Sequence, residues 1–165
     1  GRLDPLDPVP PAPSRALNSA FAVLDLPAGR GVSGIELSET PAGEILVNEI
    51  APRPHNSGHW TIEGAGCSQF EQHVRAVLGW PLGDATLRSP AVTANLLGDV
   101  TDPQIAELTE TEAILETPDA SLHWYGKREA RPLRKMGHVT LTDDETDRDA
   151  LLSRARSLVE SVSFN

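Results

Sequence analysis

The stretch NEIAPRPHNSGHW at positions 48–60 marks where a strand-like segment of this chain passes into a polar loop. Prolines and a glycine punctuate the loop, as is typical of a segment that leaves a β-strand. Four of its side chains are ionisable: Glu49, Arg53, His55 and His59. Loops that gather so many ionisable groups commonly bind or transform a ligand. We therefore expect this loop to carry much of the chain's function.

Two β-strands are predicted around a turn that precedes the loop. Val32–Ser38 and Glu44–Ile50 are strand-like runs, and the sequence TPAG at Thr40–Gly43 separates them. A short turn between two such runs predicts an antiparallel hairpin with a four-residue loop.

Glu36 and Glu49 are expected on one face of this hairpin. If Glu39 opposes Glu44 across the turn, Glu36 opposes Val47, and Glu49 lies diagonal to Glu36 on the same face. Two carboxylates on one face repel unless a cation lies between them or water solvates both. Beside the phosphates of a nucleotide, such a pair commonly holds Mg²⁺. The alternative is a solvent-facing strand with scattered acids.

Arg53, His55 and His59 allow three interpretations. The arginine fork suits a small oxyanion such as bicarbonate, and His55 could act as a general base or donate to the same anion. Alternatively, His55 and His59 could ligate zinc together with Cys67, although the single cysteine argues against this. In the third interpretation the histidines only cap backbone groups of the loop.

Helices are predicted on both sides of the hairpin and loop. Apolar residues recur at helical spacing over Ser14–Leu26 and again over Phe70–Leu78. Ser68 and Glu71 have the spacing of a capping box, and Gly79 is expected to end the second helix.

The second half of the chain is predicted to be rich in β-strands and closed by a helix. Strands are expected at 91–97, 122–125 and 138–141, and a helix at 103–115. One face of the last helix is apolar and carries Leu151, Ala155, Leu158, Val159 and Val162.

These elements predict an α+β fold in two unequal parts. We place the first domain at 14–88 and the second at 89–165, with a boundary in the segment around Leu82–Pro90. Positions 1–13 begin with Gly1 and are rich in proline, which suggests a linker or a cut edge.

A basic cluster stands out in the second half of an otherwise acidic chain. Only one acid, Glu129, interrupts its members, which are Lys127, Arg128, Arg131, Arg134, Lys135 and His138. A basic loop between strands suits a phosphate-bearing small ligand, and the alternative is a solvated basic face. A glycine-rich phosphate loop of the Walker or Rossmann type is not present in the sequence.

Composition narrows the class of protein. The 165 residues carry a formal net charge of −10, which argues against general nucleic-acid binding. Apolar runs of the roughly 20 residues needed to cross a bilayer are absent, and a signal peptide is not visible. The single cysteine fits a reducing compartment. We expect a soluble, cytoplasmic protein.

Taken together, the motifs resemble the C-terminal part of the PurK family, the 5-(carboxyamino)imidazole ribonucleotide synthases of the ATP-grasp superfamily. The resemblance covers roughly positions 31 to 145 and keeps the family's order of motifs. The motifs are GIEL at Gly34–Leu37, VNEIAPRPHNSGHW at Val47–Trp60, SQFEQH at Ser68–His73, RAVLG at Arg75–Gly79, NLLG at Asn95–Gly98, LHWYGK at Leu122–Lys127 and RKMGH at Arg134–His138.

The resemblance implies a fold and a reaction. The chain would comprise the last part of an ATP-grasp domain, with the hairpin and helices, followed by the small β-rich domain. ATP would phosphorylate bicarbonate, and the resulting carboxyphosphate would carboxylate the amine of aminoimidazole ribonucleotide in purine biosynthesis. This is a carbon–nitrogen ligase reaction with ATP and Mg²⁺ as cofactors.

Roles for individual residues follow from the same resemblance. Glu36 and Glu49 would hold Mg²⁺, with Asn48 and Glu49 beside the nucleotide. Arg53 would clamp bicarbonate, and His55 would lie next to the reacting amine. The ribonucleotide would be bound by Asn56, Ser57, Lys127, Arg134 and Lys135.

The family's N-terminal domain and adenine pocket have no counterpart in this sequence. We therefore expect the chain alone to bind nucleotide weakly and not to turn over without a partner that supplies that half. The resemblance also implies a homodimer. Two other functions stay open, a non-catalytic phosphate-binding module and a fragment of another bicarbonate-using ATP-grasp carboxylase.

Overall fold

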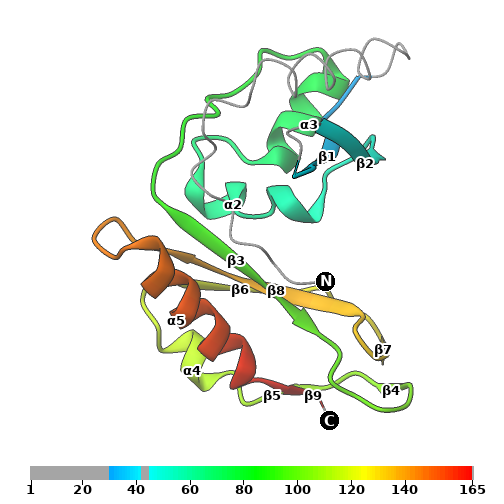
Figure 1. Ribbon diagram of the computed structural model, residues 1–165, viewed down its shortest axis with the longest axis vertical. Coiled ribbons are helices and arrows are strands. Elements are labelled where there is room, and N and C mark those ends of the chain that lie inside the picture. Colours follow the sequence, from blue (N-terminus) through cyan, green and yellow to red (C-terminus); the bar gives the residue numbers. More distant parts are fainter. Residues whose placement is uncertain (1–29, 42–44, 165) are drawn as a thin grey trace. The chain divides into compact units, whose positions relative to one another are not determined.

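The computed structural model of the chain describes residues 30–41 and 45–164 (Figure 1). They fall into two compact units, and each is described by itself. Among the described residues, the hairpin unit comprises 30–41, 45–62 and 66–86, and the sheet unit comprises Glu63–Ala65 with residues 87–164. The helix predicted at 14–26 and the turn residues 42–44 lie outside the described residues. The predicted domain limits stay predictions.

The hairpin unit contains the predicted antiparallel pair, β1 (Gly34–Glu39) and β2 (Ile45–Ala51). The predicted register is wrong, because Glu39 pairs with Ile45 and not with Glu44 next to the turn, and Glu36 pairs with Glu49 and not with Val47. Leu37 pairs with Val47, so Asn48 is an extra residue in β2 and forms a β-bulge. A bulge shifts the pairing on one side of it, which sequence alternation alone does not reveal.

Three helices follow the hairpin: η1 (Asn56–Gly58), α2 (Thr61–Gly64) and α3 (Gln69–Leu78). The predicted helix start and stop of α3 are confirmed. The Ser68 hydroxyl accepts from the Glu71 backbone N–H at 3.2 Å, and Gly79 ends the helix with a φ of 68°. The Glu71 carboxylate accepts from Arg75, at 2.6 Å from Nη2, so the first half of the capping box forms and the glutamate turns to its i+4 partner.

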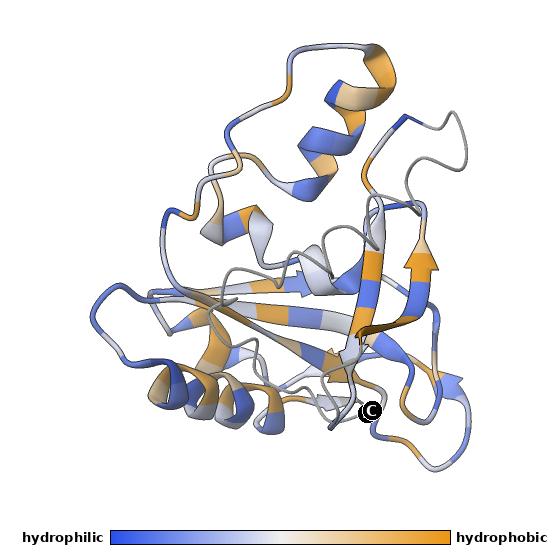
Figure 2. Cartoon of the chain, turned by 45° about the horizontal axis from the view of Figure 1, so that its top comes forward, coloured by the Kyte–Doolittle hydropathy of each residue, from blue (hydrophilic) through white to orange (hydrophobic). Residues whose placement is uncertain are grey.

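The sheet unit is built on an antiparallel sheet in the order β3 (Ala91–Leu97), β8 (Lys135–Thr142), β6 (Ala120–Trp124). Helix α5 (Arg148–Glu160) lies along one face of this sheet (Figure 1). Apolar and polar residues alternate along the strands (Figure 2), so the face under α5 is apolar. The core between α5 and the sheet contains Ala94 and Leu141 from the strands and Leu151 and Ala155 from the helix.

The opposite face of the sheet is polar and also largely buried. Asn95, His138 and Thr140 are 9%, 2% and 0% exposed. Asn95 and His123 are the cross-strand partners of His138, from β3 and β6 respectively. Three polar side chains therefore lie in a row across the three strands.

The helix predicted at 103–115 is largely wrong, because only α4 (Glu112–Leu115) is helical. Before it, β4 (Gln104–Ile105) pairs with β7 (Glu129–Ala130), and β5 (Leu108–Thr109) pairs with β9 (Ser163–Phe164). The predicted strand at 91–97 is confirmed, and the strand at 138–141 lies within the longer β8. The strand predicted at 122–125 is β6, which starts earlier and ends at Trp124. The C-terminal helix is confirmed, although it ends at Glu160, before Val162. The α+β class is confirmed.

Of the helices in the described part of the chain, none combines the length and the apolar character that a membrane span requires.

Asp143 anchors the turn that leads into α5. Its Oδ1 accepts from the backbone N–H groups of Glu145 and Thr146, and its Oδ2 accepts from the Thr146 hydroxyl and from Arg154 at 2.7 Å. These bonds, the Thr146 hydroxyl first, lower the pKa of Asp143 to about 2. Hydrogen bonds to the charged form of a carboxyl stabilise that form.

This pKa predicts an acid-sensitive contribution to stability. Because the folded pKa of about 2 lies below the usual 3.8, the contribution is complete above the usual value and is lost as the pH falls through the folded one. We expect the urea midpoint to fall more steeply with acid in the wild-type chain than in Asp143→Asn. Asp144→Asn, at an exposed neighbour, is the control and should keep the wild-type slope. Equal slopes for wild type and Asp143→Asn would contradict the prediction.

Candidate functional site

Three of the predicted site residues converge in the hairpin unit. Potential metal-ligating atoms of Glu36, Glu49 and His55 all lie within 4.8 Å of one another. The bulge in β2 makes the two glutamates direct partners across the hairpin, which places their carboxylates side by side. Glu36 also accepts a hydrogen bond from the Asn48 amide, at 3.2 Å.

The donor set fits a hard cation. Two adjacent carboxylates supply the oxygen ligands that Mg²⁺ prefers, whereas an imidazole nitrogen suits softer metals. Glu49 is exposed and Glu36 half-buried, so both carboxylates can reach a solvated ion. Glu36 and Glu49 are therefore the residues that could hold Mg²⁺.

His55 is oriented by the turn that follows it. Its Nδ1 accepts from the Ser57 backbone N–H at 3.4 Å and lies 2.9 Å from the Ser57 hydroxyl. A ring nitrogen that accepts a hydrogen bond carries no proton, so the neutral ring carries its proton on Nε2. Nε2 lies 3.6 Å from Glu36 Oε1. His55 therefore presents an N–H donor next to the carboxylate pair.

Gln69 holds this loop in place, and sequence reasoning missed it. The residue is 7% exposed, and its Oε1 accepts from the His55 backbone N–H at 2.9 Å. Its Nε2 donates to the His55 carbonyl at 2.8 Å and lies 2.9 Å from His59 Nδ1. Its role could not be inferred from the sequence, because a glutamine in the first turn of a helix is usually solvated. Its burial depends on the loop folding back over α3.

The predicted zinc set is not brought together. His59 stacks on Phe70 with ring centroids 5.6 Å apart, and its Nδ1 lies 2.9 Å from Gln69 Nε2. Within residues 30–41 and 45–164, Cys67 belongs to no group of converging metal ligands. The zinc interpretation of these histidines is therefore wrong.

Arg53 lies on the exposed part of the loop. Its Nη1 donates to the Pro54 carbonyl at 3.1 Å, and its backbone N–H donates to Ala51. Asn56 and Ser57 form the start of η1, directly after His55.

A second group of predicted residues converges in the sheet unit. The Lys127 ammonium donates to the Lys135 carbonyl and lies 5.5 Å from the centre of the Tyr125 ring. Burial and the positive charges of Arg134 and Lys135 lower the pKa of Lys127. Like charges lower the pKa of a lysine only where they lie close together. Lys127, Arg134 and Lys135 therefore form a cationic site suited to an anion.

Gly98 allows the chain that carries these cations to pack closely on β3. Its backbone N–H donates to the Arg134 carbonyl at 2.8 Å, and its carbonyl accepts from Leu133 at 3.0 Å. A Cβ atom at this position would collide with the carbonyl oxygen of Arg131. The glycine of the NLLG motif is thus explained by the close approach of the basic segment.

Two family models match this chain. The model for the phosphoribosylaminoimidazole carboxylase C-terminal domain matches residues 91–151, and the model for the ATP-grasp domain matches residues 11–70.

Two similar curated relatives are bacterial synthases. An N5-carboxyaminoimidazole ribonucleotide synthase of Mycobacterium bovis is 53% identical over 111 residues, which are 66% of this chain and 26% of that protein. The synthase of Bacillus subtilis is 46% identical over 71% of this chain and 29% of its own length. The chain thus spans between a quarter and a third of the length of these relatives.

Solved structures give the same result. The crystal structure of N5-carboxyaminoimidazole ribonucleotide synthetase from Thermotoga maritima matches with a TM-score of 0.79 and 47% identity, over 89% of this chain and 40% of that one. The synthase of Aspergillus clavatus, in complex with ADP and 5-aminoimidazole ribonucleotide, matches with a TM-score of 0.73 and 34% identity, over 89% of this chain and 39% of that one. Since sequence, family models and fold agree, this chain belongs to the N5-carboxyaminoimidazole ribonucleotide synthase family of ATP-grasp proteins.

Proposed function

We propose that this chain takes part in the ATP-dependent carboxylation of aminoimidazole ribonucleotide by bicarbonate in purine biosynthesis. The observation that carries the proposal is the convergence of Glu36, Glu49 and His55 in a member of this family. In the reaction a bicarbonate oxygen attacks the γ-phosphorus of ATP, and ADP leaves. The amine nitrogen then attacks the carboxyl carbon of carboxyphosphate, phosphate leaves, and the amine loses one proton.

The carboxylate pair is the proposed site for the metal and the nucleotide phosphates. Mg²⁺ held by Glu36 and Glu49 would neutralise charge on the ATP phosphates, which is the main catalytic demand of phosphoryl transfer. Asn48 would lie beside the nucleotide. Its amide already bonds to Glu36, so it also holds that carboxylate in place.

The loop after β2 is the proposed site of bicarbonate and of the reacting amine. A guanidinium has five N–H donors, and Arg53 uses Nη1 for the Pro54 carbonyl, so other donors suit bicarbonate. The proton on His55 Nε2 favours a donor role toward an oxyanion over the alternative role of general base. Asn56 and Ser57 would shape the site of the acceptor.

The cationic site is the proposed binding site for the ribonucleotide phosphate. Lys127, Arg134 and Lys135 supply charged donors, and charge-assisted hydrogen bonds are the strong ones for phosphate. Bicarbonate as co-substrate, homodimerisation and a cytoplasmic location remain predictions made from the sequence.

The first test measures Mg²⁺-dependent nucleotide binding by the isotopically labelled chain. We expect Mg²⁺ with ATP to shift the backbone NMR signals of Glu36, Asn48 and Glu49. Because Glu49→Gln removes one of two anionic ligands, it should weaken this response about tenfold.

Glu71→Gln is the matched control, since Glu71 is an exposed acid of the same unit that pairs with Arg75. An equal loss in both variants would contradict the assignment of Glu49. A wild-type chain whose hairpin unit does not respond, but which binds phosphate, would instead favour the non-catalytic binding module.

The second test concerns the phosphate site. Lys127→Ala should lower the affinity for ribose 5-phosphate about tenfold, as expected for the loss of a charge-assisted contact. Arg128→Ala removes a neighbouring exposed cation and should have a much smaller effect.

The pH dependence of this binding has a definite sign. Because the pKa of Lys127 lies below the usual lysine value, the ammonium loses its charge at a lower pH than an ordinary lysine does. Affinity for ribose 5-phosphate, measured by titration calorimetry, should therefore begin to fall on the alkaline side before ordinary lysines titrate. An affinity that Lys127→Ala leaves unchanged would exclude this phosphate site.

A further inference from the structure

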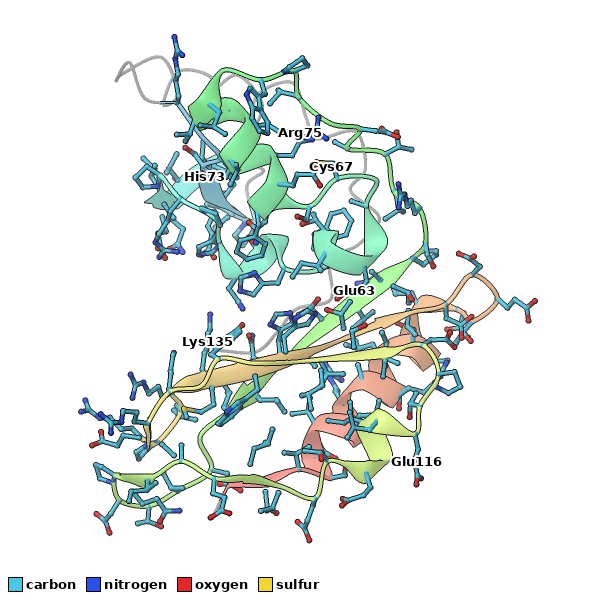
Figure 3. All side chains as sticks on the ribbon, turned by 180° about the vertical axis from the view of Figure 1, so that it is seen from behind. Glu63, Cys67, His73, Arg75, Glu116 and Lys135 are labelled. Atoms are coloured by element: carbon cyan, nitrogen blue, oxygen red, sulfur yellow. The ribbon has the colours of Figure 1, made fainter. Side chains whose placement is uncertain are left out.

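Four side chains outside the proposed sites form a continuous chain of contacts in the sheet unit. They are Glu63, His123, His138 and Tyr125. Figure 3 shows Glu63 and Lys135 on the side of the sheet away from α5. The contacts lead from the helical residue Glu63 to the aromatic ring beside Lys127.

The first contact joins Glu63 to His123. The Glu63 Oε1 lies 2.6 Å from His123 Nε2, and the Glu63 side chain is 18% exposed. A carboxylate only accepts hydrogen bonds, so His123 must donate from Nε2. The other oxygen, Oε2, is buried without a hydrogen-bond partner among the described residues. The bond to His123 is therefore the contact that compensates the burial of this carboxylate.

The second contact joins the two histidines. The rings of His123 and His138 stack with centroids 4.4 Å apart and an angle of 17° between their planes. Gly137 makes this close approach of β6 and β8 feasible, because a Cβ there would collide with the His123 carbonyl oxygen. Fixing His123 through Glu63 therefore also fixes the plane of His138.

The third contact joins His138 to Tyr125. His138 Nδ1 lies 2.8 Å from the Tyr125 hydroxyl, and the His138 side chain is almost fully buried. Tyr125 itself is 37% exposed. A hydroxyl bonded to a buried imidazole keeps this exposed ring in one orientation.

The last contact reaches the phosphate site. The Lys127 ammonium lies 5.5 Å from the centre of the Tyr125 ring, within the range of a cation–π interaction. Gly126, between the two residues, has a φ of 64°, so the chain turns back and brings the ammonium over the ring.

We propose that Glu63, His123, His138 and Tyr125 are positioning residues that hold the Lys127 ammonium in place for the phosphate of the substrate. This inference rests on the proposed function of Lys127 and adds four residues that need not touch the substrate. Without these four residues, charge repulsion would push the flexible Lys127 side chain away from Arg134 and Lys135.

The test uses the two lysines of the chain, Lys127 and Lys135. Labelling lysine Cε with ¹³C gives one NMR signal for each, and Lys135→Arg assigns them. In Tyr125→Phe and in Glu63→Ala, the Lys127 ammonium should move away from its cationic neighbours, and its measured pKa should rise toward that of an ordinary lysine. Affinity for ribose 5-phosphate should fall about threefold to tenfold, the effect of losing one hydrogen bond.

Two further variants separate positioning from general stability. Glu63→Gln keeps an oxygen acceptor for His123 and should restore both the Lys127 pKa and the affinity. Thr93→Val removes a side-chain hydrogen bond to Thr140 in the same sheet, outside the chain of contacts, and should leave the Lys127 pKa unchanged.

An unchanged Lys127 pKa in folded Tyr125→Phe and Glu63→Ala overturns the proposal. So does a rise in Thr93→Val equal to that in Glu63→Ala, because any loss of stability would then suffice. If the wild-type chain does not bind ribose 5-phosphate, the phosphate function fails, while the pKa measurements still decide whether the four residues position Lys127.

Discussion

A single extra residue in a strand determines the candidate metal site. With Asn48 bulged out of β2, Glu36 and Glu49 face each other directly across the hairpin. Without the bulge they would be offset by one pair, and the mutual repulsion of the carboxylates would be smaller. The same bulge residue donates its amide to Glu36. The bulge therefore both brings the two carboxylates together and supplies the amide that holds one of them.

Elements that depend on local pattern could be predicted from the sequence. The strand at Ala91–Leu97 alternates along its length, and the apolar face of the C-terminal helix has helical period. The helix predicted at 103–115 is wrong outside Glu112–Leu115, because Gln104–Ile105 and Leu108–Thr109 pair with distant strands. Pairing between segments so distant in sequence overrides local propensity.

In the candidate site, too, some residues could be predicted from the sequence and others could not. Glu36, Glu49 and His55 could be singled out from residue type and spacing, and the structure brings them together. Gln69 could not be singled out in this way, because its role is to hydrogen-bond His55, which lies 14 positions earlier in the chain. The contact between Glu63 and His123 could not be predicted from the sequence either, because the two residues are 60 positions apart. Sequence patterns reveal charged groups, whereas the neutral or distant groups that orient them appear only in three dimensions.

The cationic site has a thermodynamic consequence. Folding partly buries Lys127 close to Arg134 and Lys135, and both the burial and these positive charges lower its pKa, so the charged ammonium is destabilised there. An unfolded chain separates these charges and avoids the repulsion. A bound phosphate would remove the repulsion and form new contacts at once, so ligand binding and folding of the sheet unit are coupled. An anion held by these three cations would therefore stabilise the folded sheet unit.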